Sequence, residues 1–209
     1  FGTLTMGDTD GALDKANAEV ASLTAIADDH TAHSGYNGGA GLDAIHDTDD
    51  ILRYDTTYAG FGISASLGQS DVAVANDVIA YGITTTLGTV AVSAAYQSDN
   101  TRDITAVSGK TTVGDLGITA NYSEASMGAT DASYEHTGLG LAYTLNGVNL
   151  HANYGNYDFD DGSNADGYGL AANYGLGGGA TVMVGYGNGT AQNVAADVTT
   201  FSVGLGLSF

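Results

Sequence analysis

The sequence predicts an all-β fold, a transmembrane antiparallel β-barrel of twelve strands. Three observations predict it: apolar residues recur at every second position, tight glycine-rich turns separate these runs, and tyrosines lie near the strand ends. Residues 201–209 show the pattern most clearly. In a strand, successive side chains point to opposite faces, so this segment has one apolar face and one small, polar face. The apolar face consists of Phe201, Val203, Leu205, Leu207 and Phe209.

Five hairpins with the same alternation precede this last strand. Their predicted strands cover 52–58 and 61–67, 79–87 and 90–96, 103–112 and 116–122, 139–145 and 148–154, and 168–176 and 181–186. Asn146-Gly147 between two alternating runs is the strongest short-range hairpin signal. With a first strand at 2–7 and the terminal strand, the count reaches twelve.

The turns differ in length on the two sides of the predicted sheet. The hairpin turns contain two or three residues, whereas the connections at 69–76, 98–102, 124–131, 156–166 and 188–196 are longer and polar. Short turns on one side and long loops on the other are typical of membrane barrels. A soluble β-sandwich would not need this asymmetry.

Tyrosines give a second indication of a membrane. Tyr96, Tyr122, Tyr154 and Tyr186 follow a short turn at the far end of each apolar run, while Tyr58, Tyr143 and Tyr174 precede a short turn. Two aromatic bands at the strand ends are expected where a barrel meets the two membrane–water boundaries. A general preference of tyrosine for strands would not explain this placement.

Composition excludes several functions. The 209 residues include no Cys, Pro or Trp, and 24 acidic against four basic residues give a net charge of −20. Such a charge disfavours nucleic acid as a partner. No apolar run is long enough for a transmembrane helix. The inward positions are mainly Gly, Ala, Ser, Thr, Asn and His, which suit a wet lumen better than a dry core. Because no nucleophile, base and orienting group can be assigned together, we expect no enzyme activity.

One connection is much longer than the others. Residues 8–50 show no sustained alternation and hold ten acidic residues. A loop of this length is usually functional or disordered. An Ala-rich stretch from Asp10 to Ala27, with Leu13, Val20 and Leu23 at helical spacing, predicts a short helix capped by Asp10.

These features together resemble a known family. A strand ending in Met6-Gly7-Asp8, a long acidic loop, the segment Ile51-Leu52-Arg53-Tyr54-Asp55 and a run of hairpins to a terminal Phe are similar to the general porins of alphaproteobacteria, such as those of purple photosynthetic bacteria. The resemblance implies a sixteen-stranded barrel whose third loop follows the fifth strand and narrows the lumen. It also implies homotrimers in the outer membrane of a Gram-negative bacterium. The twelve strands match the family's fifth to sixteenth. Either the sequence is partial, which we expect, or it closes as a twelve-stranded barrel.

The resemblance also assigns roles to individual residues. It places the long loop inside the barrel, so its carboxylates would line the pore constriction and favour cations. These candidates are Asp28, Asp29, Asp43, Asp47, Asp49 and Asp50. The alternative is that they are solvated loop carboxylates outside the current path. Arg53 and Asp55 alternate with Leu52 and Tyr54 and should face the lumen wall, as should His151. In the family, wall arginines oppose the acidic loop, and a terminal aromatic residue, here Phe209, serves as the assembly signal.

Metal binding is a further candidate property. Asp47, Asp49 and Asp50 supply closely spaced hard oxygen ligands for calcium, which porins of this family bind near the third loop. The alternative reading is a solvated surface, or carboxylates that bridge lipopolysaccharide through divalent cations. No cofactor is required for diffusion. His30 and His33 have a spacing that could suit zinc on a helix, but we expect solvated side chains at the end of the predicted helix.

The sequence therefore predicts one β-barrel domain over 1–209, with a constriction loop at about 8–50. The expected function is an outer-membrane porin with a water-filled channel for passive diffusion of ions and small hydrophilic solutes, favouring cations. Its expected partners are two further copies of the chain, outer-membrane lipid and lipopolysaccharide. The alternatives are a plugged outer-membrane barrel that acts as an anchor or adhesin, and an outer-membrane barrel enzyme. A Gly-rich β-solenoid would need a fixed repeat length, which the unequal loops do not show.

Overall fold

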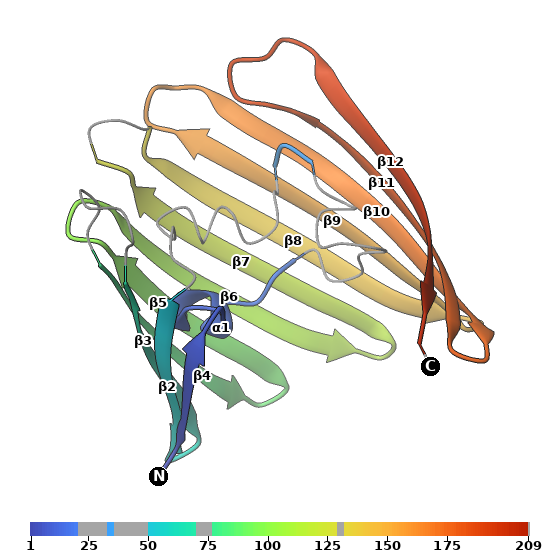
Figure 1. Ribbon diagram of the computed structural model, residues 1–209. Coiled ribbons are helices and arrows are strands. Elements are labelled where there is room, and N and C mark those ends of the chain that lie inside the picture. The colour runs from blue at the N-terminus through green and yellow to red at the C-terminus, as the bar shows by residue number, and fades with distance from the viewer. Residues whose placement is uncertain (21–32, 36–49, 70–76, 129–131, 209) are drawn as a thin grey trace. The chain divides into compact units, whose positions relative to one another are not determined.

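The computed structural model describes residues 1–20, 33–35, 50–69, 77–128 and 132–208. Twelve strands form one antiparallel sheet in sequence order, which confirms the predicted fold class (Figure 1). The strands are β1 Thr3–Gly7, β2 Asp50–Tyr58, β3 Phe61–Gln69, β4 Val78–Leu87, β5 Val90–Ser98, β6 Asp103–Val113, β7 Leu116–Ser126, β8 Tyr134–Leu145, β9 Val148–Phe159, β10 Asn164–Gly177, β11 Ala180–Thr190 and β12 Asp197–Leu207. Among the described residues there is one helix, α1, at Ala12–Ala16.

The described residues fall into two compact units. The first contains α1, β1 to β5, β6 as far as Lys110 and β7 from Asn121. The second contains residues 33–35, β8 from His136, and β9 to β12. Each unit is described by itself below. The single β-barrel domain inferred from the sequence stays a prediction.

Tight turns fix the strand register in both units. In the second unit, Asn146 and Gly147 both have positive φ (51° and 83°), as a type I′ turn requires between β8 and β9. In the first unit, Ala59 and Gly60 (φ 51° and 85°) join β2 to β3 in the same way. The pairing then runs without a shift from Tyr58↔Phe61 to Asp50↔Gln69. The residues that alternate in the sequence therefore stay on one face along the hairpin.

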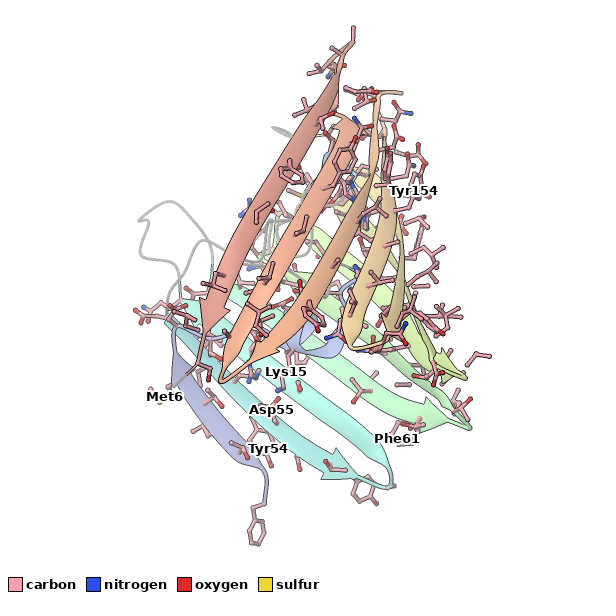
Figure 2. All side chains as sticks on the ribbon, turned by 90° about the vertical axis from the view of Figure 1, so that its right-hand side faces the viewer. Met6, Lys15, Tyr54, Asp55, Phe61 and Tyr154 are labelled. Carbon is pink, nitrogen blue, oxygen red and sulfur yellow. The ribbon has the colours of Figure 1, made fainter. Side chains whose placement is uncertain are left out.

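Each unit exposes large apolar side chains on one face of the sheet, whereas the other face is mostly small or polar and also buries a few larger residues, among them Ile51, Ile104 and Tyr157. We call the face covered by α1 or by residues 33–35 the inner face, and the opposite one the outer face. On the outer face Leu4, Tyr54, Tyr81, Leu141, Leu170 and Phe201 are exposed. On the inner face Arg53, Ser108, Asn121, His136, His151 and Asn153 are buried. In the first unit Met6, Tyr54 and Phe61 lie on the outer face, and Lys15 and Asp55 on the inner face (Figure 2).

This distribution is the reverse of a soluble protein. Exposed contiguous apolar patches beyond a few hundred Å² are rare on soluble monomers. A row of exposed Leu, Ile, Val and Tyr along every strand is what a lipid-facing surface requires. The described helix is not long and apolar enough to span a membrane. The outer face is therefore built to contact lipid.

Aromatic residues pair across neighbouring strands in each unit. In the first unit, Tyr81 pairs with Tyr96, while Tyr58 pairs with Phe61 at the opposite strand end. In the second unit, Tyr154 pairs with Tyr168, whose ring centroid lies 6.1 Å from that of Tyr186. Tyr154 and Tyr168 lie inside β9 and β10 rather than at their ends, so the membrane–water boundaries inferred from the tyrosines stay a prediction.

Two local predictions are wrong. The helix covers only Ala12–Ala16, and its N-cap is Gly11 rather than Asp10, with no capping side-chain hydrogen bond. Asn17 already has an extended backbone (φ −79°, ψ 140°), so the predicted short helix ends at Ala16, and residues 21–27 of the Ala-rich stretch lie outside the described residues. The predicted loop at 156–166 is also too long, because β9 runs to Phe159 and β10 starts at Asn164. A turn over residues 160–163 joins them, closed by a hydrogen bond from the Phe159 amide to the Ser163 carbonyl.

Candidate functional site: the inner face and the segments that lie on it

In the first unit, α1 lies against the inner face of β3, β4 and β5 (Figure 1). Ala12 and Leu13 are fully buried there. The contact with β4 is close because Gly82 has no side chain. A Cβ at Gly82 would lie 2.5 Å from both the Ala12 carbonyl oxygen and the Ala16 Cβ. Ser66 Oγ on β3 accepts a hydrogen bond of 2.9 Å from the Ala12 amide, which has no partner within the helix.

Arg53 on β2 fastens the residues just before this helix. Its side chain is buried, and its Nε lies 3.0 Å from Asp55 Oδ2 in an ion pair. One terminal nitrogen donates to the carbonyl of Asp10 and, over 3.3 Å, to Thr9 Oγ1. Ser64 Oγ donates to the other Asp55 oxygen at 2.7 Å. Arg53 therefore contacts both the sheet, through Asp55 on β2, and the segment before α1, through Thr9 and Asp10.

The residues after the helix also form hydrogen bonds with the inner face of the sheet, on β6 and β7. The Ala18 amide donates to Ser108 Oγ at 2.8 Å, and Asn121 Nδ2 donates to the Ala18 carbonyl at 3.1 Å. Ser108 in turn lies 2.6 Å from Ser93 Oγ. We call residues 9–18, with these contacts, the first anchor.

In the second unit, residues 33–35 lie on the inner face of β8 to β11. His33 Nε2 is 2.9 Å from Asn153 Oδ1, and the Gly35 amide donates to His33 Nδ1 at 3.2 Å. His136 Nε2 lies 3.0 Å from the Gly35 carbonyl oxygen, so His136 donates this hydrogen bond. We call residues 33–35, with these contacts, the second anchor.

Glycines on the wall make the second anchor possible. A Cβ at Gly155 would lie 2.0 Å from the Gly35 carbonyl oxygen, and a Cβ at Gly167 would lie 2.6 Å from His33 Nδ1. Such contacts are too short for any real side chain. Because the obstructing atom at Gly155 belongs to the backbone, a rotamer change cannot relieve the contact. Only glycine on the wall permits this approach.

The sequence led us to expect a solvated His33 side chain, and this prediction is wrong because the side chain is buried. His33 is 7% exposed. Burial lowers the pKa of His33 below its ordinary value of 6.5, against the opposing influence of its hydrogen bond to Asn153 and of the Asp166 charge. His33 therefore holds the turn in its neutral form. Across the described residues no group of three His, Asp or Glu is placed to hold a metal ion.

The predicted wall residues face the inner side of their units. Arg53 and Asp55 lie together on the inner face of β2. His151 is buried on the inner face of β9, where it forms a hydrogen bond with the backbone of Val20. Arg53 contacts the Asp10 carbonyl and Asp55, whereas the family resemblance implied that it faces the acidic loop across the lumen. The roles of these residues in conduction stay predictions.

Among the predicted constriction and calcium residues, Asp50 lies in the described part, exposed at the first position of β2. Asp28, Asp29, Asp43, Asp47 and Asp49 lie outside the described residues, as does Phe209. The role assigned to each of them stays a prediction.

The residues that hold the covering segments are not apparent from the sequence. Alternation assigns Ser66, Ser108 and Asn121 only to a small polar lumen surface, and Gly82 and Gly155 only to the strands. A weak signal is present, because a glycine in a strand interior often marks the close approach of another backbone. The sequence does not say which glycine has that role. A Cβ at Gly155 would meet the Gly35 backbone, whereas a Cβ at Gly175 would meet nothing within 4 Å.

Comparison with known proteins identifies this architecture. A family model described as Gram-negative porin matches residues 1–194. A porin structure refined at 1.8 Å resolution superimposes with a TM-score of 0.74 at 19% identity, covering 100% of this chain and 78% of that one. OmpT of Vibrio cholerae in its trimer form gives 0.71 at 18%, covering 99% and 77%. A variant of the Rhodopseudomonas blastica porin gives 0.69 at 17%, covering 100% and 73%.

No curated protein sequence matches the chain significantly. The structural likenesses therefore establish the fold, and the family model, which spans nearly the whole chain, establishes the relationship. The apolar outer face and the polar inner face agree with both. The chain belongs to the Gram-negative porin family and is an outer-membrane protein.

Proposed function

We propose that the protein is a passive diffusion channel for ions and small hydrophilic solutes that favours cations. The observation that supports this most is an inner face rich in small and polar side chains beneath an apolar outer face. Ser, Asn and His side chains are buried on the inner face and hold two short segments by hydrogen bonds, alongside apolar residues such as Leu13 and Ile104. A channel needs no bond chemistry, only a wetted path of limited width.

The first experiment is single-channel recording in a planar bilayer under a KCl gradient. Large ohmic steps with a cation-favouring reversal potential are expected. A correctly folded protein that gives no current across the membrane would contradict the channel and favour the plugged anchor or adhesin.

We also propose an assembly of three identical chains, as in the trimer form of Vibrio cholerae OmpT. Steps that arrive and close in threes are its expected signature, and single independent steps would contradict it.

Cation preference is proposed for the carboxylates of the long loop. The net charge of −20 and the ten acidic residues within 8–50 support it. Asp28→Asn with Asp29→Asn should shift the reversal potential toward zero without collapsing the barrel, because it removes negative charge at the constriction. An unchanged reversal potential would show that these two carboxylates lie outside the current path. Asp197→Asn, at the start of β12, is a control that removes one carboxylate far from the long loop in the sequence, so its effect per charge can be compared with that of the double variant.

The finer family assignment is also a proposal. The alphaproteobacterial type is proposed from the sequence resemblance, since the structures of Rhodopseudomonas blastica porin and Vibrio cholerae OmpT match this chain about equally well. Calcium binding by Asp47, Asp49 and Asp50 is proposed from ligand chemistry alone, since carboxylate oxygens are the donors that calcium prefers. A rise in the unfolding temperature with added calcium, lost in Asp47→Asn with Asp49→Asn, is expected. A calcium effect of equal size in the variant would exclude this site.

A further inference from the structure

We propose that the first unit contains a binding pocket for a small hydroxylated carboxylate, a solute of the gluconate type, and that Lys15 recognises its carboxylate. The proposal rests on the proposed function, because it names a class of solute that would bind on its way through the channel. A cavity of about 510 Å³ lies between α1 and the strands β1 to β4. That volume is sufficient for a small organic acid.

The pocket lies on the inner face. Thr3 pairs with Asp55, and Thr57 pairs with Gly62, so these residues share the inner side of β1, β2 and β3. Thr84 continues that side on β4 because it pairs with Gly62. Figure 2 shows Lys15 from α1 and Asp55 from β2 on this side, while Tyr54 lies on the outer face.

Lys15 supplies the positive charge. It is exposed, while its helix neighbours Ala12, Leu13 and Ala16 are buried against the wall. The other cation of this region, Arg53, is already engaged by Asp55 and the Asp10 carbonyl. No carboxylate of the described residues lies within 4.0 Å of the Lys15 ammonium, which interacts with the Asp55 carboxylate at longer range. An ammonium group can therefore donate charge-assisted hydrogen bonds to an anion that enters the pocket.

The other lining groups match the rest of such a solute. Thr3, Thr57, Ser64 and Thr84 line the cavity; the threonine hydroxyls can donate and accept, whereas Ser64, which donates to Asp55, can accept. Asp55 receives hydrogen bonds from Arg53 and Ser64, which hold its carboxylate in place, and it can accept further ones. Lys15 can pair with one carboxylate of a solute, but the Asp55 carboxylate would repel a second anionic group. A solute with one carboxylate and several hydroxyls therefore fits the pocket better than a dicarboxylate.

The experiment measures block of the potassium current by sodium gluconate added at millimolar concentration. Gluconate is expected to reduce the wild-type current in a saturable manner. Lys15→Gln should raise the half-blocking concentration about tenfold, the usual consequence of losing a hydrogen bond to a charged group. Lys110→Gln is the matched control, since Lys110 is the other exposed lysine and does not line the pocket. Equal effects of both variants would overturn the proposal, because they would show only a change of bulk charge.

Two related probes test the hydroxyl contacts. Sodium acetate carries the carboxylate alone, and sorbitol carries the hydroxyls alone, so each should block the wild type more weakly than gluconate. Thr57→Val with Thr84→Val should weaken block by gluconate but not by acetate, because valine keeps the shape and removes the hydroxyl. Acetate that blocks as well as gluconate would overturn the assignment of a hydroxylated ligand.

A calorimetric titration of the detergent-solubilised protein with gluconate separates this proposal from the channel itself. Absence of current steps without gluconate would contradict the proposed function alone. Heat of binding that disappears in Lys15→Gln and persists in Lys110→Gln would still support the pocket. Absence of binding to the folded wild-type protein would overturn the pocket even if the channel conducts.

Discussion

The two anchors hold their segments on the sheet by different chemistry. The first anchor depends on the Arg53 guanidinium and on the hydroxyls of Ser66 and Ser108, which bind backbone groups of residues 10–18. The second depends on His33 and His136 and on glycines that let the Gly35 backbone touch the wall. A guanidinium keeps its charge throughout the range in which proteins fold, whereas imidazole changes charge between about pH 5 and 8. The second anchor should therefore respond to acid, and the first should not.

The largest effect on the second anchor is expected at Gly155, where the backbone of β9 contacts the backbone of Gly35. Gly155→Val would place a side chain in the space of the Gly35 carbonyl, 2.0 Å from the new Cβ, so the second anchor must detach. Overpacking of this kind typically costs about 1–3 kcal/mol. Faster hydrogen exchange at the Gly35 amide and an altered single-channel conductance are expected. Gly175→Val is the control, since a Cβ there meets nothing within 4 Å. An unchanged conductance and exchange rate in Gly155→Val would show that this contact does not fix residues 33–35.

Arg53→Met tests the first anchor. It removes the ion pair with Asp55 and the donors to Asp10 and Thr9 while keeping most of the side-chain volume. Because Asp55 is partly exposed to water, we expect a loss of about 1–3 kcal/mol from the free energy of unfolding. Urea unfolding of the detergent-solubilised protein measures it. Lys110→Met, which removes a cation without these contacts, should change stability by about 0.5 kcal/mol or less. Equal losses in both variants would contradict the role of Arg53.

Acid should weaken the second anchor selectively. The folded-state pKa of His33 is lowered from 6.5 by burial, against the hydrogen bond with Asn153 and the nearby Asp166 charge. The unfolded or detached state therefore binds the proton more readily, so the stabilisation is fully present above pH 6.5 and declines as the pH falls below it. His136 faces the same turn through the Gly35 carbonyl. Exchange at the Gly35 amide should speed up relative to that at the Ala12 amide between about pH 7.5 and 5, the range in which imidazole titrates. His33→Gln should remove this difference, and its persistence in the variant would assign it to another group.

The smallest effect is expected for a single hydroxyl of the first anchor. Ser66→Ala removes the acceptor of the Ala12 amide, which is a partly buried hydrogen bond. The expected loss is about 0.5–1.5 kcal/mol, smaller than for Arg53→Met. The Ala12 amide should exchange faster while the Ala18 amide, bound to Ser108, is unchanged. Faster exchange at both amides would show that the first anchor opens as a whole.

Local chemistry determined the strands and their faces. Tyr58, the turn at Ala59-Gly60 and Phe61 define the β2–β3 hairpin because a tight turn fixes the register, and a period of two then fixes every later side chain. The same alternation predicts the apolar outer face. It also predicts that Arg53, Asp55 and His151 lie on the inner side, where all three are found. These properties depend on neighbours only a few positions apart.

Only the tertiary structure decided which segments pack on the inner face and which residues they contact there. His33 and Asn153 are separated by 120 positions in the chain, and His136 and Gly35 by 101. No local pattern pairs them, because the pairing depends on where a covering segment lies on an assembled sheet.

The helix shows the same division between local and distant causes. Helical spacing from Leu13 to Leu23 is a local signal, and it predicts a short helix in this stretch without fixing where that helix ends. The helix α1 ends at Ala16, where the backbone turns extended and the wall hydroxyl of Ser108 binds the Ala18 amide instead. The sequence by itself determined the wall, because strand alternation and tight turns act over a few residues. The packing of distant segments decided how that wall is covered.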